Sequence, residues 1–263
     1  MEMSRAAITR IDVETKKSER KTDWIAREKP LYVFLGRTHC VTIFCSPTNL
    51  KELSVGHLLA EGFVKSVGEI KELNLDAKKM ICRVDLKSSV NVKSRMQLLK
   101  PYSRVILSAC GSGTPFQFSN RLLKVKSTVK VKADVVLESV RNLNFRAATF
   151  RKTGGVHGAA IYGGDGSFLA FAEDVGRHNA VDKVIGMMAM RSADFSECFL
   201  ALTGRLSGDV VLKAAKVGIS IVASMAAALD SGVAVARRSG ITLIGFVRGG
   251  RMNIYAFPER ILM

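Results

Sequence analysis

The chain has 263 residues, of which 48% are hydrophobic and 24% charged, with 22 glycines and only 5 prolines. This composition is that of a globular protein, and it excludes disorder throughout the chain. A chain of this length buries a core without disulfides or a metal. The 40 lysines and arginines against 23 acids give a formal net charge of +17, which favours an anionic partner.

Several function classes are excluded by simple patterns. No apolar stretch approaches the roughly 18 uncharged residues that a membrane span needs. Residues 1–29 carry charges of both signs and lack the apolar core of a signal peptide. We therefore expect a soluble cytoplasmic protein without membrane contact.

The first half of the chain contains short strands and one helix. Apolar runs predict strands over residues 31–35, 40–45, 80–86 and 104–108. A helix follows Asn49, whose side chain we expect to cap it with Glu52 as the capping-box partner, and it ends near Gly62. Residues 1–133 hold 25 cations against 12 acids, a net charge of +13, whereas residues 134–263 hold 15 against 11, or +4. The basic half is thus the β-rich half.

The second half alternates regularly between helices and strands. Helical spacing occurs over residues 134–145, 179–191, 208–217 and 230–238, and strands are predicted over 156–162, 168–172, 199–203, 219–224, 241–247 and 253–257. Such alternation predicts an α/β fold with a sheet covered on both faces. We divide the chain into a basic N-terminal arm (1–27), a smaller β-rich region (28–133) and an α/β region (134–263).

The five cysteines are an odd number at irregular spacing, which favours reduced thiols. Cys110 differs from the others because it follows a predicted strand and precedes Gly-Ser-Gly, where a bulky partner can approach. Taken alone, the pattern fits a reactive thiol or a loop cysteine without a role equally well.

Three glycine-containing segments follow or precede strands in the second half. In Thr153-Gly154-Gly155-Val-His157 the glycines could leave backbone N–H groups open for an anion, and His157 could donate a proton. The alternative is a turn followed by a half-buried strand histidine. Thr203-Gly204-Arg205 and the run Phe246-Val247-Arg248-Gly249-Gly250-Arg251 place arginines beside glycines after strands, where guanidinium groups can meet phosphates.

The segment from Glu173 to Lys183 contains the densest group of polar residues between two apolar elements. We interpret Asn179 as the cap of the following helix and Asp182 as its N3 residue. Capping leaves four side chains unexplained, and these are site candidates: Glu173, Asp174, Arg177 and His178.

In their combination and order these segments resemble the formate dehydrogenase accessory sulfurtransferases, the FdhD family. The matching segments are Glu28 to Leu31, Ser54 to Gly62, the Cys110 loop, Thr153 to His157, Glu173 to Lys183, Thr203 to Arg205 and Asn253 to Arg260. The resemblance covers nearly the whole chain.

The resemblance implies a cytidine-deaminase-like three-layer fold with a mixed sheet and a homodimer. It implies that Cys110 takes sulfur from a cysteine desulfurase and delivers it to the molybdenum cofactor, bis(molybdopterin guanine dinucleotide), of formate dehydrogenase. We assign the binding of that cofactor, as a substrate, to Gly154, Gly155, His157, Glu173, Asp174, Arg177, His178, Thr203, Gly204, Arg205, Phe246, Val247, Arg248, Gly249, Gly250 and Arg251.

Two departures from related patterns matter. The family loop commonly reads Cys-x-x-Cys, but its second position here is Gly113, so Cys110 can hold a persulfide without a neighbouring thiol for a disulfide or relay. The deaminases that share the expected fold use a His/Cys zinc site. Here Gly158 and Ala159 follow His157 and no Pro-Cys-x-x-Cys occurs, so we expect no zinc.

Two other function classes remain as alternatives. The charge of +17 fits a basic nucleotide- or nucleic-acid-binding protein without sulfur chemistry, although no reader motif is present and we expect no nucleic acid partner. A hydrolase with a Cys110–His157 dyad would need the two side chains within hydrogen-bond distance.

Overall fold

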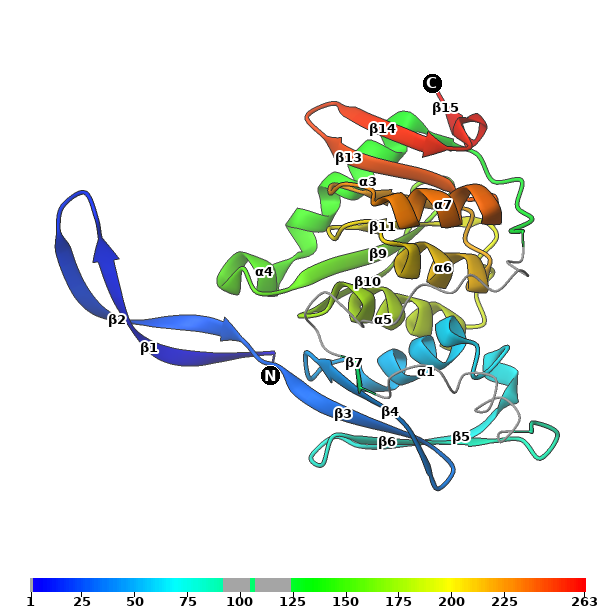
Figure 1. Cartoon of the computed structure of the whole chain (residues 1–263), viewed down its shortest axis with the longest axis horizontal. Coiled ribbons are helices and arrows are strands. Elements are labelled where there is room, and N and C mark those ends of the chain that lie inside the picture. Colours follow the sequence, from blue (N-terminus) through cyan, green and yellow to red (C-terminus); the bar gives the residue numbers. More distant parts are fainter. Residues whose placement is uncertain (1, 92–104, 107–123) are drawn as a thin grey trace.

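The computed structural model describes residues 2–91, 105–106 and 124–263 and has the predicted mixed α/β architecture (Figure 1). Its central sheet has the order β10-β9-β11-β12-β13-β14. The middle strands β11 (Cys198–Leu202), β12 (Ile221–Ser224) and β13 (Thr242–Arg248) are parallel, and they are flanked by antiparallel strands. The flanking strands are β9 (His157–Gly163), β10 (Phe168–Asp174) and β14 (Arg251–Ala256).

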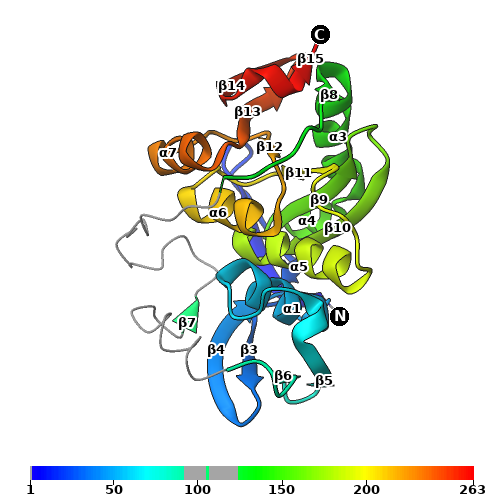
Figure 2. The same cartoon turned by 90° about the vertical axis from the view of Figure 1, so that its right-hand side faces the viewer.

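Helices cover both faces of this sheet, which gives three layers (Figure 2). One face carries α3 (Ala133–Arg146), whose Val136, Val140 and Leu143 are fully buried against the strands. The other face carries α5 (Arg177–Met190), α6 (Gly208–Val217) and α7 (Asp230–Ser239). The predicted helices are confirmed, whereas the specific cytidine-deaminase-like fold stays a prediction.

The first half forms a second sheet with the order β5-β6-β3-β4-β7 and one helix, α1 (Leu50–Glu61). Its strands are β3 (Lys29–Leu35), β4 (Thr38–Cys45), β5 (Ile70–Asp76), β6 (Ile81–Leu86) and β7 (Val105–Ile106). Strand β5 was not predicted from the sequence. Asn49 occupies the cap position of α1, but its side chain makes no capping hydrogen bond, so the expected capping box is wrong. The backbone of Asn49 is in the left-handed region, with φ of 50°. A residue whose side chain caps a helix typically has an extended backbone.

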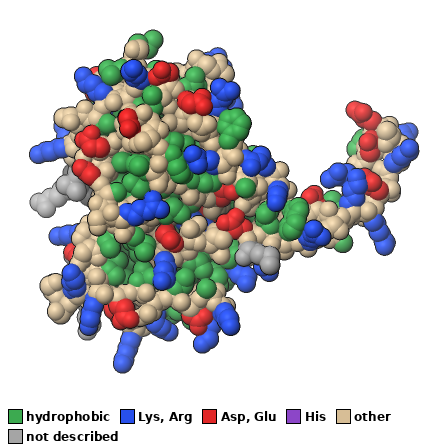
Figure 3. Space-filling view, turned by 180° about the vertical axis from the view of Figure 1, so that it is seen from behind, with side chains coloured by type: hydrophobic (Ala, Val, Ile, Leu, Met, Phe, Trp, Pro, Cys, Tyr) green, Lys and Arg blue, Asp and Glu red, His purple; other side chains and the backbone are tan. Residues whose placement is uncertain are grey.

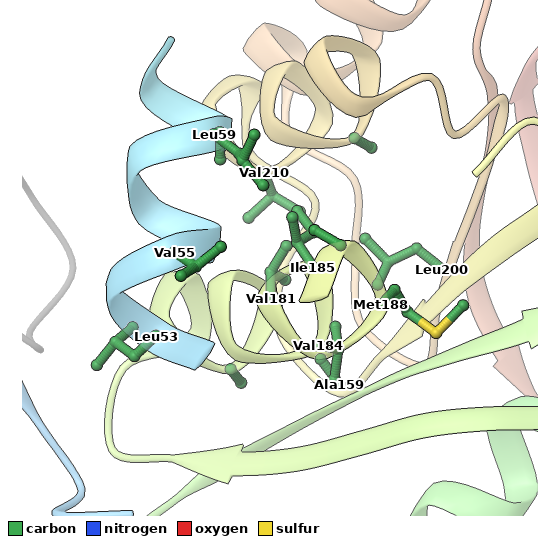
Figure 4. Packing of buried hydrophobic residues seen from close by; sticks show 14 of the residues in the cluster. Leu53, Val55, Leu59, Ala159, Val181, Val184, Ile185, Met188, Leu200 and Val210 are labelled. Atoms are coloured by element: carbon green, nitrogen blue, oxygen red, sulfur yellow. The ribbon is translucent and has the colours of Figure 1, made fainter. Parts of the chain in front are cut away.

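The helices α1 and α5 join the two halves at a close crossing. A Cβ added at Gly56 would lie 1.7 Å from the carbonyl oxygen of Asp182, and one added at Gly186 would lie 1.9 Å from that of Glu52. Glycine is therefore required at both positions. Val55 and Leu59 of α1 point toward α5 and α6 around this crossing (Figure 4), so one hydrophobic core extends through both halves.

The N-terminal residues, predicted as a basic arm, form a β-hairpin of β1 (Met3–Asp12) and β2 (Lys17–Ala26), and these two strands were not predicted. Smaller elements are α4 (Ala148–Thr153), the 3₁₀ turns Val67–Glu69 and Pro258–Arg260, and the paired strands β8 (Val131–Lys132) and β15 (Ile261–Leu262). Within the described residues, no helix has the length and apolar character to cross a membrane.

Candidate functional site

One edge of the central sheet collects most of the predicted site residues. The parallel strands β11, β12 and β13 all end there, and their antiparallel neighbour β9 begins there. The carboxyl ends of parallel strands are where α/β proteins place ligands. The segments that begin at Thr153, Glu173, Thr203 and Phe246 therefore meet at one edge although they are distant in the sequence.

The start of β9 and the end of β11 are joined directly. The N–H of Thr203 donates to the carbonyl of Gly158 at 3.0 Å, and the N–H of Gly158 donates to the Thr203 hydroxyl at 3.0 Å. On the other side of β9, His157 is the register partner of Asp174. The half-buried His157 thus lies between the segment that begins at Glu173 and the one that begins at Thr203.

Arg177 and Arg205 bring positive charge to the part of this edge around His157. A Cβ added at Gly204 would lie 2.9 Å from the Cβ of Arg177, so the glycine lets the loop after β11 pack on the start of α5. Arg177 is buried and Arg205 is exposed. Burial and the positive charges of Arg177 and Arg205 lower the pKa of His157. His157 is consequently a neutral imidazole beside two guanidinium groups at pH 7.

His178 is a second neutral imidazole at the start of α5. Burial, followed by the charges of Arg177 and Lys213, lowers its pKa to about 3. Its Nε2 lies 3.5 Å from the hydroxyl of Ser207, a residue that the sequence analysis did not single out. A neutral imidazole can donate one hydrogen bond and accept another, so His157 and His178 can both serve an anion or a proton.

Asp174 is buried and forms part of the support of the site. Its carboxylate pairs with Lys183 at 2.7 Å, and both side chains are 0% exposed. The same carboxylate accepts hydrogen bonds from the N–H groups of Ser46 and Gly176 and from the amide of Asn179. These contacts fix the first turn of α5, which carries Arg177, against the first half of the chain.

Glu173 also binds backbone N–H groups. Its two oxygens accept hydrogen bonds from the N–H groups of Thr149 at 2.9 Å and Phe150 at 2.8 Å. Glu173 thereby caps α4, the short helix that leads to Gly154.

The glycines after α4 differ from the expectation of open N–H groups. The N–H of Gly154 donates to the carbonyl of Phe150 at 2.7 Å, and that of Gly155 donates to the hydroxyl of Thr153 at 3.1 Å. Gly154 has φ of 64° and ends the helix in a left-handed conformation. The expected anion nest is therefore wrong here, since these N–H groups are used to terminate α4.

The predicted cap of α5 is also wrong. The helix begins at Arg177 with Gly176 as its N-cap, two residues before the expected start. Asn179 instead donates to the carbonyl of Phe44 at 2.8 Å as well as to Asp174. Asp182 pairs with the imidazole of His57 at 3.1 Å and with Lys213 at 2.9 Å. The contacts of Asn179 and Asp182 are therefore made with residues distant in the sequence, which the local pattern does not contain.

This second buried network joins α1, α5 and α6, and sequence reasoning missed it. Lys213 bridges Asp182 and Glu61 at 2.9 Å each, and the two anions raise its pKa although burial opposes this. His57 and Glu61, within the otherwise largely apolar segment Ser54 to Gly62, could have indicated this network.

The run from Phe246 to Arg251 forms the turn between β13 and β14. Gly249 and Gly250 have φ of 58° and 76°, as a two-residue hairpin turn requires at both central positions. Arg248 and Arg251 are register partners and are exposed, and Arg248 lies over the ring of Phe246 at 5.3 Å. Val247 is buried. Strand β13 lies two strands from β11, a lateral spacing of about 10 Å, and the turn extends β13 beyond the level of Thr203.

Cys110 lies outside the described residues, four positions after the end of β7. The four cysteines that the structure describes, Cys40, Cys45, Cys82 and Cys198, are all buried. Burial raises the pKa of Cys45 to about 12 and that of Cys198 to about 11, and it also raises that of Cys82. Cys82 lies in β6 and Cys198 at the start of the fully buried strand β11.

Arginines and neutral imidazoles at strand ends beside helix starts are typical of α/β proteins that bind anionic ligands. The chain belongs to the FdhD/NarQ family, which matches residues 26–262. It is 37% identical over 243 residues to the sulfur carrier protein FdhD of Bacillus subtilis, covering 91% of this chain and 90% of that protein. It is 36% identical over 243 residues to the FdhD protein of Staphylococcus haemolyticus, with the same coverage.

A solved structure agrees with this assignment. A Desulfotalea psychrophila protein described as a formate dehydrogenase accessory protein superimposes with a TM-score of 0.78 at 25% identity. The match covers 99% of each chain. The predicted family is therefore confirmed by sequence and by structure.

Proposed function

We propose that this chain is a sulfur carrier that takes persulfide sulfur from a cysteine desulfurase onto Cys110 and delivers it to the molybdenum cofactor of formate dehydrogenase. The observation that carries the proposal is the similarity to FdhD sulfur carrier proteins along 91% of the chain.

The loading step is a thiol–persulfide exchange. The Cys110 thiolate attacks the outer sulfur of the desulfurase persulfide, a new S–S bond forms, and the desulfurase cysteine leaves as a thiolate. The step involves no net oxidation. On delivery the outer sulfur becomes a sulfido ligand, the metal supplies two electrons, and Cys110 returns to the thiolate. One thiol is sufficient for this cycle, so Gly113 does not prevent it.

The described cysteines support Cys110 as the carrier by exclusion. A persulfide carrier needs a thiolate that a protein partner can approach. Cys45 is 0% exposed and Cys198 is 3% exposed, and burial raises the pKa of both thiols. Neither meets the requirement.

The sheet edge supports binding of the cofactor's guanine nucleotide portion. Arg177 and Arg205 supply charge for a pyrophosphate, and the neutral His157 and His178 supply hydrogen bonds without adding repulsion between cations. The exposed Arg248 lies two strands away, where a second phosphate or the base could bind. Glu173 and Asp174 act in this proposal through α4 and α5 and do not contact the ligand.

Intact-mass spectrometry tests the proposal. After incubation with a cysteine desulfurase and cysteine, the wild-type chain should gain the mass of one sulfur atom, and Cys110→Ala should gain none. Cys198→Ala is the matched control and should load normally. Loading of Cys110→Ala to the wild-type level would contradict the proposal. GDP binding without any sulfur gain in the wild type would favour a nucleotide-binding protein that transfers no sulfur.

A further inference from the structure

Positive charge alone does not locate a ligand on this chain. Lysine and arginine side chains are spread over the face that Figure 3 shows, the N-terminal hairpin included. The acids around the start of α5 are held by partners within the protein, since Glu173 caps α4, and Asp174 and Asp182 pair with buried lysines. An acid that lacks such a partner is therefore the more informative group.

Asp209, in the first turn of α6, is such an acid. It is half-buried, and its side chain makes no hydrogen bond or ion pair with any other residue that the structure describes. Burial raises the pKa of its carboxyl group, and the charge of Glu61 on α1 adds to this effect, whereas the positive charges of Lys213 and Arg177 oppose it and favour the ionised form. A desolvated carboxylate without a donor is unfavourable, so Asp209 is suited to a ligand that supplies one.

Asp209 borders the sheet edge described above. Ser207, the N-cap of α6, lies two positions before it and places its hydroxyl 3.5 Å from Nε2 of His178. Arg205 comes two positions earlier still, in the loop after β11. The carboxylate is therefore close to the arginine and imidazole groups that the proposed function assigns to a pyrophosphate.

The loop before Asp209 is fixed against the start of α7. The N–H of Leu206 donates to the carbonyl of Ala227 at 2.9 Å, and the N–H of Leu229 donates to the carbonyl of Leu206 at 3.0 Å. A Cβ added at Gly232 would lie 2.2 Å from that same carbonyl oxygen, so α7 packs directly on the loop. The position of Asp209 is thus set before a ligand binds.

The charges around Asp209 select the class of ligand. Lys213 and Arg177 lie close enough to act on the carboxyl group, and they repel an ammonium group or a metal ion. No cluster of metal-ligating side chains occurs in the part of the chain that the structure describes. A neutral group with two adjacent N–H donors is free of that repulsion, and the two oxygens of a carboxylate accept such a pair in parallel.

We infer that Asp209 binds the donor edge of an aminopyrimidinone ring, the ring that guanine and pterin share. On this edge a ring N–H lies beside the exocyclic amino group, and both donors point in the same direction. The inference rests on the proposed function, because the cofactor to be bound carries both guanine and pterin. It adds the residue that distinguishes these rings from rings without the amino group.

Calorimetry at low salt with matched pairs of probes tests the inference. Asp209→Asn replaces one carboxylate oxygen by an amino group of similar size. Xanthine and lumazine carry an oxygen where guanine and pterin carry the amino group, so they match the asparagine amide. The wild type should bind GDP about ten-fold more tightly than xanthosine diphosphate, or pterin about ten-fold more tightly than lumazine. Asp209→Asn should reverse that preference, which a merely structural role would not do.

Asp230→Asn is the matched control, because Asp230 is an exposed acid in the first turn of the neighbouring helix α7. It should keep the preferences of the wild type. Circular dichroism checks that both variants are folded. Reversal with the nucleotides identifies guanine as the ring that Asp209 contacts, and reversal with the free rings identifies pterin.

Two results would overturn the inference: a wild type without a preference in either pair, or an Asp209→Asn protein that keeps the wild-type preference in both. Sulfur loading of Cys110, measured separately by intact mass, distinguishes this failure from failure of the proposed function. Normal loading with unreversed preferences refutes the role of Asp209 alone. Reversed preferences in a chain that gains no sulfur would support the role of Asp209 and contradict the sulfur carrier.

Discussion

The buried pair of Lys183 and Asp174 predicts a large loss of stability when the lysine is removed. In Lys183→Met the ammonium group disappears while the side chain keeps much of its volume. Asp174 stays 0% exposed and loses an ion pair of 2.7 Å. The carbonyl groups of Ser46 and Glu173 also lose a donor.

The expected loss follows from the charge that is left behind. Breaking a buried ion pair by removing one partner costs about 3–5 kcal/mol, because the remaining charge is uncompensated. Three donors still reach Asp174, so we expect about 3 kcal/mol. The exposed pair Lys79–Asp76, at 3.7 Å with the lysine side chain 75% exposed, is the matched control. Exposed pairs contribute less than about 1 kcal/mol, so Lys79→Met should have little effect.

Urea unfolding followed by circular dichroism measures both variants. Burial raises the pKa of Asp174, and removal of Lys183 raises it further, so the lone carboxylate takes up a proton more readily as the pH falls. The loss in Lys183→Met should therefore be smaller at pH 5 than at pH 8. The double variant Lys183→Met/Asp174→Asn should recover part of the stability. A loss in Lys183→Met no larger than in Lys79→Met would refute the reasoning.

Three further predictions concern the sheet edge. Arg177→Gln should weaken GDP binding roughly ten-fold at low salt by loss of a charged hydrogen bond, and calorimetry with unchanged affinity would contradict its role. His178 has a folded pKa of about 3 against about 6.5 when unfolded, so the wild type should lose stability as the pH falls below 6.5. His178→Gln should flatten that loss, and identical pH profiles in urea would exclude the buried neutral imidazole. Glu173→Gln removes one charged acceptor at α4 and should increase hydrogen exchange at Thr149 and Phe150, with proteolysis elsewhere unchanged. Unaltered exchange there would show that the cap is dispensable.

Most of the fold could be predicted from the sequence, because the spacing of apolar residues shows which face of a helix or strand is buried. The strands of the central sheet and α3, α6 and α7 match the predicted ranges to within about two residues. The hairpin was missed because its strands have no buried face, so no apolar alternation marks them. Strand β5 was missed for a related reason, since its exposed Lys71 and Glu72 interrupt the pattern.

The location of the site was easier to predict than the role of each residue. Glycines, arginines and histidines near strand ends marked segments that the structure brings to one edge of the central sheet, and their role in binding stays a prediction. Local pattern could not assign Asn179, because its partners Phe44 and Asp174 come from different strands. A polar residue near a helix start is a cap, a ligand group or a buried partner according to what the tertiary fold brings near it.

Polar side chains are therefore concentrated in the segment from Glu173 to Lys183 for two physical reasons. Asp174 and Lys183 satisfy each other in the interior and hold α5 in place, since a lone buried charge would cost several kcal/mol. Arg177 and His178 begin the same helix at the sheet edge, beside the loop that follows β11. The buried pair fixes the direction of the helix start, and a ligand that binds there finds arginine and imidazole groups already positioned. In the proposed function, the polar residues of this one short segment divide between support and binding, according to the partners that the tertiary fold brings near each side chain.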